Sequence, residues 1–268
     1  MPAASEAIER AALADLHAAA TPALIDALQL RAVETGTGLV SIGGALPASA
    51  IVVNRALGVG LGAPETEATM GAMFDAYREA GVARYFVQRH PDAQPPAIVD
   101  WCRAAGLEKA RGWQKFARGR EPVPDAPTDL RVEEIGSEHG LAFGRLVSDA
   151  FDLGPEAAPW LALLPGRPDW RMFMSFDGDE PAGTGGLYIQ DGIAWTDWGA
   201  TAPAFRQRGG QAAVLAARVR CAIDAGCEAI FTCTGEDVPG DPQHSYNNIR
   251  KLGFREEYVR ENYAPPKL

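Results

Sequence analysis

The sequence predicts an α/β (α+β) protein with two similar domains in tandem, each a mixed, mostly antiparallel sheet flanked by helices. Its 268 residues suit two domains of about 130 residues each. The segment 118–129 reads RGREPVPDAPTD, and three prolines in a polar stretch predict an extended linker. Short strand-like and helix-like segments alternate on both sides of it. The expected domains are therefore 1–120 and 129–268, joined by a linker at 121–128.

In the C-terminal half, apolar runs predict strands, and segments with helical spacing end at glycines. The expected strands are 130–135, 170–176, 182–189, 193–201, 227–234 and 254–259. The expected helices are 137–151, 155–164, 209–225 and 244–252. We expect Ser137 to cap the first of these helices. Consecutive antiparallel strands followed by a strand–helix–strand crossover predict a mixed sheet with helices on both faces.

The N-terminal half repeats this order weakly. The expected helices are 4–20, 22–30, 65–80 and 95–105, and the expected strands are 38–43, 51–57, 82–88 and 113–117. The segment WCRAAGL at 101–107 occupies the place that IRKLGF at 249–254 has in the second half. We interpret the two halves as a degenerate internal repeat.

Composition excludes several classes of partner. The net charge is −10, and no basic stripe of the kind that binds nucleic acid or anionic membranes is present in the sequence. We therefore expect no nucleic acid, no membrane and a cytoplasmic monomer or homodimer. The four cysteines have no metal-ligand spacing, so we expect reduced thiols and no metal. We expect His17, His90 and His139 to be surface residues.

A glycine-bearing loop opens the predicted helix 209–225. The loop and the helix start comprise Arg206, Gln207, Arg208, Gly209, Gly210, Gln211 and Ala212. A helix start presents unpaired N–H groups and the positive end of the helix dipole, and glycines allow close backbone approach. The sequence therefore predicts an anion site suited to a pyrophosphate, to which the arginines add charge.

This loop resembles the motif Gln/Arg-x-x-Gly-x-Gly/Ala with which GNAT N-acetyltransferases cradle the pyrophosphate of acetyl-CoA. Arg206 and Gly209 match the motif, whereas Gln211 stands where Gly or Ala is usual. With Gln at this position the helix start still offers its N–H groups.

A second segment lies about 40 residues further on, the distance that a helix, a strand and a second helix start require. It is similar to the late GNAT segment S-x-x-N-x-x-x-x-G-F, and the matching residues are Ser245, Asn248, Gly253 and Phe254. For the last two alone, a helix stop and a core aromatic are the better explanation. Asn248 has two readings, contact with the cofactor or a capping role.

The resemblance covers about residues 130–263 and implies acetyl-CoA as cosubstrate and direct attack by a primary amine. It implies a backbone N–H that polarises the thioester carbonyl, which we assign to Gly199, Ala200 or Thr201. Many family members have a tyrosine acid four residues before the late glycine, but Ile249 stands there. Tyr246 and Ser245 are the remaining candidates for that role.

Asp197 is the candidate general base. It lies on the strand that leads into the glycine loop, and Trp195 is on the same side by two-residue alternation. A solvated strand residue or a structural ion-pair partner is the alternative role for this carboxylate.

The N-terminal half has no equivalent of the glycine motif. The corresponding segment 60–65 reads GLGAPE. Pro64 lacks an N–H, and Glu65 places a carboxylate where a phosphate would lie. We predict that this half does not bind CoA productively.

Two other functions compete with amine acetylation. Gln211 and Ile249 depart from the family pattern, which keeps open a non-catalytic acyl-CoA-binding or sensing module. A nucleotide-binding protein is a third reading, but no Gly-Lys-Ser/Thr follows the loop. The acceptor, a small-molecule or peptide amine, is set by pocket shape and is not readable from the sequence.

Overall fold

The computed structural model describes residues 2–267, which divide into two compact units. The first unit extends to Trp113 and resumes at Tyr258, and the second is Gln114–Glu257. The expected linker 121–128 thus lies within the second unit. The limits differ because two long strands, β5 (Glu108–Arg118) and β11 (Arg255–Ala264), each pass from one unit to the other.

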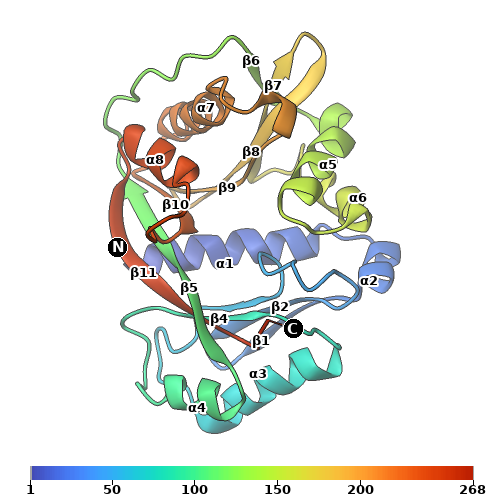
Figure 1. Ribbon diagram of the computed structural model, residues 1–268, viewed down its shortest axis with the longest axis vertical. Coiled ribbons are helices and arrows are strands. Elements are labelled where there is room, and N and C mark those ends of the chain that lie inside the picture. The colour runs from blue at the N-terminus through green and yellow to red at the C-terminus, as the bar shows by residue number, and fades with distance from the viewer. Residues whose placement is uncertain (1, 268) are drawn as a thin grey trace. The chain divides into compact units, whose positions relative to one another are not determined.

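The first unit is a mixed, mostly antiparallel sheet between helices. Its other strands are β1 (Leu30–Thr35), β2 (Gly38–Gly43), β3 (Arg55–Leu57) and β4 (Phe86–Arg89). Its helices are α1 (Pro2–Ala18), α2 (Pro22–Leu28), α3 (Glu67–Glu79) and α4 (Ile98–Ala104). The strand order is β1-β2-β3-β4-β11, and only the β3–β4 pair is parallel. Helices α3 and α4 cover one face of this sheet and α1 covers the other (Figure 1).

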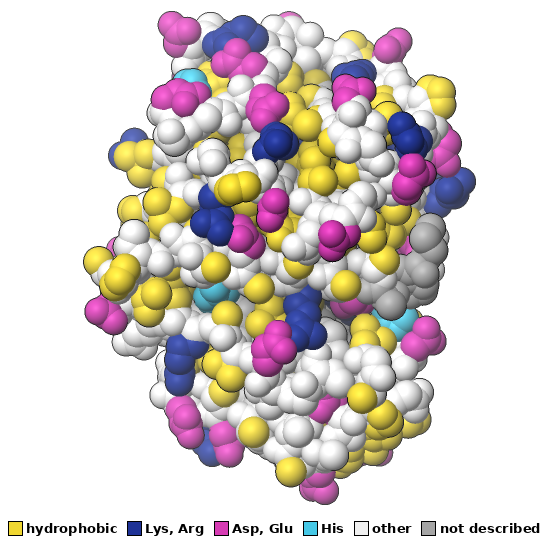
Figure 2. All heavy atoms as spheres, turned by 180° about the vertical axis from the view of Figure 1, so that it is seen from behind, with side chains coloured by type: hydrophobic (Ala, Val, Ile, Leu, Met, Phe, Trp, Pro, Cys, Tyr) yellow, Lys and Arg dark blue, Asp and Glu magenta, His cyan; other side chains and the backbone are white. Residues whose placement is uncertain are grey.

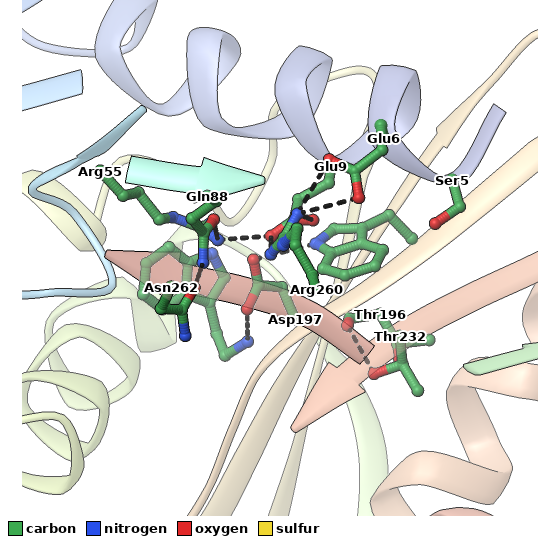
Figure 3. A network of polar contacts seen from close by, with 12 residues as sticks. Ser5, Glu6, Glu9, Arg55, Gln88, Thr196, Asp197, Thr232, Arg260 and Asn262 are labelled. Carbon is green, nitrogen blue, oxygen red and sulfur yellow. Dashed lines mark hydrogen bonds and ion pairs between the residues drawn. The ribbon is translucent and has the colours of Figure 1, made fainter. Parts of the chain in front are cut away.

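Helix α1 is held on its sheet by buried charges. Arg260 on β11 donates to Glu9 at 2.6 and 3.0 Å and to Glu6 at 3.0 Å. Arg55 on β3 pairs with the same Glu9 carboxylate, as Figure 3 shows. Because buried charges are tolerated only when they are paired, the two arginines and two glutamates fix the position of α1 in this unit.

The second unit is also a mixed sheet. Its other strands are β6 (Arg131–Ile135), β7 (Trp170–Asp177), β8 (Glu180–Gln190), β9 (Ile193–Thr201) and β10 (Ala229–Gly235). Its helices are α5 (Gly140–Ala150), α6 (Ala158–Leu161), α7 (Gly210–Asp224) and α8 (His244–Lys251), with short 3₁₀ turns at Ser137–His139, Pro155–Ala157 and Pro203–Phe205. The strand order is β5-β10-β9-β8-β7-β6. Helices α7 and α8 lie on one face, and α5 and α6 lie on the other (Figure 1). The predicted fold class is confirmed in both units.

Three local predictions were wrong. The expected helix 22–30 ends at Leu28, because Gln29 adopts a left-handed conformation (φ 50°). Strand β1, which the sequence did not predict, begins at the next residue, Leu30. The expected strand 51–57 shrinks to Arg55–Leu57, because turns occupy 51–53. Ser137 caps no helix: it begins a 3₁₀ turn whose N-cap is Gly136.

The histidines also differ from expectation. His17 and His90 are buried and His139 is half-buried, so none of the three is a fully exposed surface residue. His17 shares a hydrogen bond of 2.8 Å with Ser41 of β2. His139 packs against the Phe176 ring at 5.2 Å.

The surface carries charges of both signs. On the face seen in Figure 2, acidic and basic side chains are interspersed. The four cysteines form no disulfide with one another. Within residues 2–267 no single helix is long and apolar enough to cross a membrane, although the bent pair Ala4–Ala18 and Pro22–Leu28 passes the same length and composition test together.

Candidate functional site

The parallel strands β9 and β10 separate before they end. Their ladder has three residue pairs and stops at Trp195 and Phe231, yet β9 continues to Thr201 and β10 to Gly235. One residue beyond the ladder, the Thr232 hydroxyl donates a hydrogen bond of 3.1 Å to the Thr196 carbonyl oxygen (Figure 3). Ligands of α/β sheets bind at the carboxyl ends of parallel strands, so this separation marks a candidate site.

A β-bulge in β9 lies at the same level. Gly186 pairs with Asp197 and Thr184 with Ala200, so Gly185 alone faces two residues of β9, Trp198 and Gly199. Trp198 has φ +52°, which is unusual for a bulky residue. Bulges re-aim side chains and are common beside active sites.

The bulge leaves backbone donors on the side from which β10 has departed. The Ala202 N–H donates to the Ala182 carbonyl of β8 at 2.9 Å. Because N–H groups alternate in direction along a strand, those of Thr201 and Gly199 point away from β8. Two of the three residues predicted to polarise a carbonyl thus direct their N–H groups to the separation, whereas Ala200 faces β8.

Asp197 accepts hydrogen bonds from two of its neighbours in the chain. Trp195 Nε1 donates to Asp197 Oδ2 at 3.0 Å, and the Trp198 backbone N–H donates to Oδ1 at 2.8 Å. The expected proximity of Trp195 is confirmed. The carboxylate is half-buried and precedes the bulge by one residue, so it is close in the chain to the donors at Gly199 and Thr201.

The start of α7 has the geometry of an anion site. Gly209 is the N-cap with φ +79°, and no side chain caps the helix. A Cβ on Gly209 would lie 2.3 Å from the Pro127 carbonyl oxygen, so this position requires glycine on two grounds. The first helical bond runs from Ala213 N to Gly209 O, and the N–H groups of Gly210, Gln211 and Ala212 precede it.

The two arginines of the loop have different environments. Arg208 donates to Asp129 at 2.6 Å and to Asp177 at 2.7 Å, and these bonds lower the pKa of both carboxyls. Its charge is therefore matched within the protein, so Arg208 has less charge to offer an anion than the sequence suggests. Arg206 is exposed, and Gln207 is exposed in a left-handed conformation (φ +67°).

Three predicted residues meet across α7 and α8. Gln211 Nε2 donates to Ser245 Oγ at 2.9 Å, and Asn248 Nδ2 donates to Gln211 Oε1 at 2.7 Å. The Gln211 side chain thus points to α8 and leaves the start of α7 clear. This explains how glutamine replaces the small residue of the family motif.

Tyr246 lies apart from this group. It is buried in the core cluster that also holds Ile249, and its ring packs edge-on against Phe116 at 5.0 Å. Burial, followed by a hydrogen bond with Glu256, raises the pKa of Tyr246 to about 12. The structure therefore gives Tyr246 a packing role.

The first unit has a glycine loop of its own, but a carboxylate occupies it. Glu65 Oε1 accepts from the Thr37 N–H at 2.6 Å and from the Thr37 hydroxyl at 2.5 Å, and Oε2 accepts from the Thr69 hydroxyl at 2.6 Å. Burial opposes ionisation, but these bonds outweigh it and lower the pKa of Glu65. Thr66 caps α3 directly after Glu65, so protein groups satisfy this helix start.

One residue near the site was missed from the sequence. Arg218 of α7 is buried beneath the bulge of β9 and donates to the carbonyl oxygens of Asp197 and Gly186. The available signal was an arginine on the apolar stripe of the predicted helix, flanked by Leu215 and Val219.

Neither a protein-family model nor a curated protein matches the sequence. Solved structures do match. A GCN5-related N-acetyltransferase from Kribbella flavida has a TM-score of 0.61 at 17% identity, covering 95% of this chain and 96% of its own. A putative GNAT-family acetyltransferase from Novosphingobium aromaticivorans has a TM-score of 0.54 at 17% identity, with 87% and 89% covered.

A third similar structure has two GNAT domains. It is a tandem GNAT protein from the clavulanic acid biosynthesis pathway, with a TM-score of 0.55 at 17% identity over 78% of this chain and 73% of its own. At such identities the likeness concerns the fold, and it agrees with the resemblance carried by the two sequence motifs. This chain has the GNAT fold of N-acetyltransferases, in its tandem form.

Proposed function

We propose that this protein is an acyl-CoA-dependent N-acetyltransferase. Acetyl-CoA binds to the second unit, with its pyrophosphate at the start of α7 and its thioester between β9 and β10. The acceptor is a primary amine of a small molecule or peptide. Two neighbouring features support the proposal. Strands β9 and β10 separate after Trp195 and Phe231, and α7, the next α-helix after β9, starts without a side-chain cap.

The start of α7 supplies the phosphate contacts. N–H groups of the first helical turn and the helix dipole favour a dianionic pyrophosphate. Gly209 and Gly210 allow the phosphates to approach the backbone, and exposed Arg206 adds a positive charge. The bond between Gln211 and Asn248 positions α8 beside this helix.

The reaction is direct attack. The amine nitrogen forms a bond with the thioester carbonyl carbon, and the carbonyl oxygen becomes an oxyanion. This oxyanion accepts a hydrogen bond from the backbone N–H of Gly199 or Thr201. The C–S bond then breaks, and the thiolate of CoA leaves with the electron pair. Asp197 takes the proton that the acceptor ammonium must lose before its nitrogen can attack.

The thiolate is protonated on departure. Ser245 accepts a hydrogen bond from Gln211, and a hydroxyl that accepts keeps its own proton to donate. Of the two residues proposed from the sequence for this role, Ser245 fits, since Tyr246 is packed in the core. Solvent water is the other proton source.

The first unit does not bind acetyl-CoA in this proposal. The Glu65 carboxylate, held by Thr37 and Thr69, has the charge and the place that a phosphate would need. One cosubstrate per chain follows.

The test is release of free CoA thiol from acetyl-CoA in the presence of a panel of amines, comprising amino acids, polyamines, aminoglycoside antibiotics and peptides. We expect acceptor-dependent thiol release. Asp197→Asn keeps a hydrogen-bond acceptor for Trp198 but loses the base, and it should lower kcat by roughly 10²–10⁴-fold. Saturable binding of acetyl-CoA without turnover on any amine would instead support an acyl-CoA sensing module, which the burial of Tyr246 and Ile249 favours.

A further inference from the structure

Helix α7 carries a buried arginine that the proposed reaction does not yet use. Arg218 is 4% exposed and lies on the stripe of α7 that includes Val214, Leu215 and Val219. Burial lowers the pKa of Arg218 to about 10, which leaves the guanidinium charged at neutral pH. Burying a charge costs more free energy than burying an apolar side chain, so an arginine at this position suggests a specific role.

The guanidinium bonds to the two residues that flank the bulge. Arg218 Nη1 donates to the Asp197 carbonyl at 2.9 Å and to the Gly186 carbonyl at 3.1 Å. These residues face each other across β8 and β9 at the last regular pair before the register shifts. A bulge disrupts the ladder locally, and Arg218 provides donors for the carbonyl oxygens at that point.

Two glycines give the guanidinium its space. A Cβ on Gly185 would lie 2.5 Å from Arg218 Cζ, a distance that no real side chain tolerates. A Cβ on Gly199 would lie 3.5 Å from Arg218 Nη2. The positive charge is therefore next to the backbone of Gly199, the residue whose N–H points to the separation between β9 and β10.

We propose that Arg218 is a positioning residue for acyl transfer: it holds the Trp198–Gly199 bulge in shape and strengthens the Gly199 N–H as a donor to the thioester oxygen. The inference rests on the proposed function, because it assigns the carbonyl of acetyl-CoA to this N–H. A fixed buried cation beside the donor stabilises the oxyanion more than the neutral carbonyl, since charge develops in the transition state. Arg218 therefore acts on kcat rather than on acetyl-CoA affinity.

The test has a readout that needs no acceptor. Acetyl-CoA labelled with ¹³C at the thioester carbonyl is bound to wild type, Arg218→Met and Arg218→Lys, and the carbonyl stretch is measured by difference infrared spectroscopy. We expect a shift to lower frequency in wild type, loss of that shift in Arg218→Met at an unchanged Kd, and partial retention in Arg218→Lys. The matched control is Arg220→Met, which removes the exposed arginine two residues along α7 and should leave the shift intact.

Two further measurements keep the test decisive. Gly185→Ala displaces the guanidinium without removing it and should also reduce the shift, which covers the case in which Arg218→Met does not fold. Amide NMR of the ligand-free protein should show the Trp198 and Gly199 resonances moving in Arg218→Met and Arg218→Lys but not in Arg220→Met.

The outcomes separate the two claims. A wild-type shift that persists in Arg218→Met overturns the inference while acetyl-CoA binding stands. Unmoved Trp198 and Gly199 amides overturn the claim that Arg218 holds the bulge, whatever the protein binds. If wild type does not bind acetyl-CoA, the proposed function fails and the polarising role of Arg218 fails with it.

Discussion

Asn248 Nδ2 donates to Gln211 Oε1 at 2.7 Å, and this bond ties α8 to the first turn of α7. Gln211 in turn donates to Ser245, so one side chain on α7 engages two on α8. The family motif usually has a small residue at this position, and here the glutamine is turned away from the helix start.

Gln211→Ala tests the orientation of this side chain. Removing it breaks the link between α7 and α8, and we expect a loss of about 1 kcal/mol in unfolding free energy. The Kd for acetyl-CoA should be unchanged, because the N–H groups of the helix start are retained. Chemical denaturation and calorimetric titration measure the two quantities. A large loss of affinity in Gln211→Ala would show that the side chain itself contacts the cosubstrate.

The two arginines of the loop should differ in their effect on binding. Arg206 is exposed and Arg208 is engaged by Asp129 and Asp177. We expect Arg206→Ala to weaken acetyl-CoA binding several-fold and to reduce its dependence on salt, because a charge near the phosphates is lost. Arg208→Ala serves as the matched variant and should have the smaller effect. The reverse order in titrations at low and high salt would contradict the assignment.

Glu65 should behave as an internal anion of the first unit. Its pKa is lowered in the folded state, so its stabilising contribution is present above the ordinary value of 4.5 and is lost as pH falls through the lower folded value. Glu65→Gln should therefore lose less stability than wild type on acidification below about pH 4.5.

Glu65→Ala opens the place of this carboxylate. Added acetate should raise the thermal stability of Glu65→Ala more than that of wild type, because an anion that binds only the folded state stabilises it. Matched chloride solutions control for ionic strength. An equal response of the two proteins to acetate would argue against an anion site at Thr37 and Thr69.

His17 should make the first unit sensitive to acid. Burial lowers the pKa of His17 to about 4 from its ordinary 6.5. Between these pH values His17 is protonated in the unfolded chain but stays neutral in the folded protein. The unfolding free energy therefore falls as pH falls from 6.5 towards 4. At about 1.4 kcal/mol per pKa unit the loss reaches at most ~3.5 kcal/mol.

The comparison is with His17→Gln, which cannot take up this proton and can still bond Ser41. Denaturant unfolding at pH 7 and pH 5 should show a smaller difference for the variant than for wild type. Parallel behaviour of the two proteins over this range would mean that the pKa of His17 is the same in the folded and unfolded states.

Much of the second unit was readable from the sequence. Strand β9 has the predicted bounds, because an Asp-Gly turn and an apolar run delimit it. Ser245 and Asn248 were named from the second motif and Gln211 from the first, but their mutual hydrogen bonds were not predicted. The elements that carry strong local signals were therefore the ones that the sequence located best.

What escaped prediction depends on partners distant in the chain. The ion pairs of Arg208 reach back 79 residues to Asp129, and no local pattern indicates them. The bulge at Trp198 breaks the two-residue alternation on which strand prediction rests. The contacts of Arg218 follow from that bulge and were hidden with it. In the first unit, strand β1 was not predicted, and the predicted helix 22–30 ran one residue into it because the apolar run continues through Leu30.

The most direct test of the central claim is calorimetric titration of acetyl-CoA into wild type, Ala212→Glu and Ala212→Gln. A glutamate in the first turn stabilises a helix but repels a phosphate at the helix start. Lost binding in Ala212→Glu therefore cannot be attributed to unfolding. The glutamine variant controls for the size of the side chain. We expect one site per chain in wild type, weakened binding in Ala212→Glu at equal or greater thermal stability, and near-normal binding in Ala212→Gln. No binding by wild type at millimolar acetyl-CoA, or equal affinity in all three proteins, would contradict the claim.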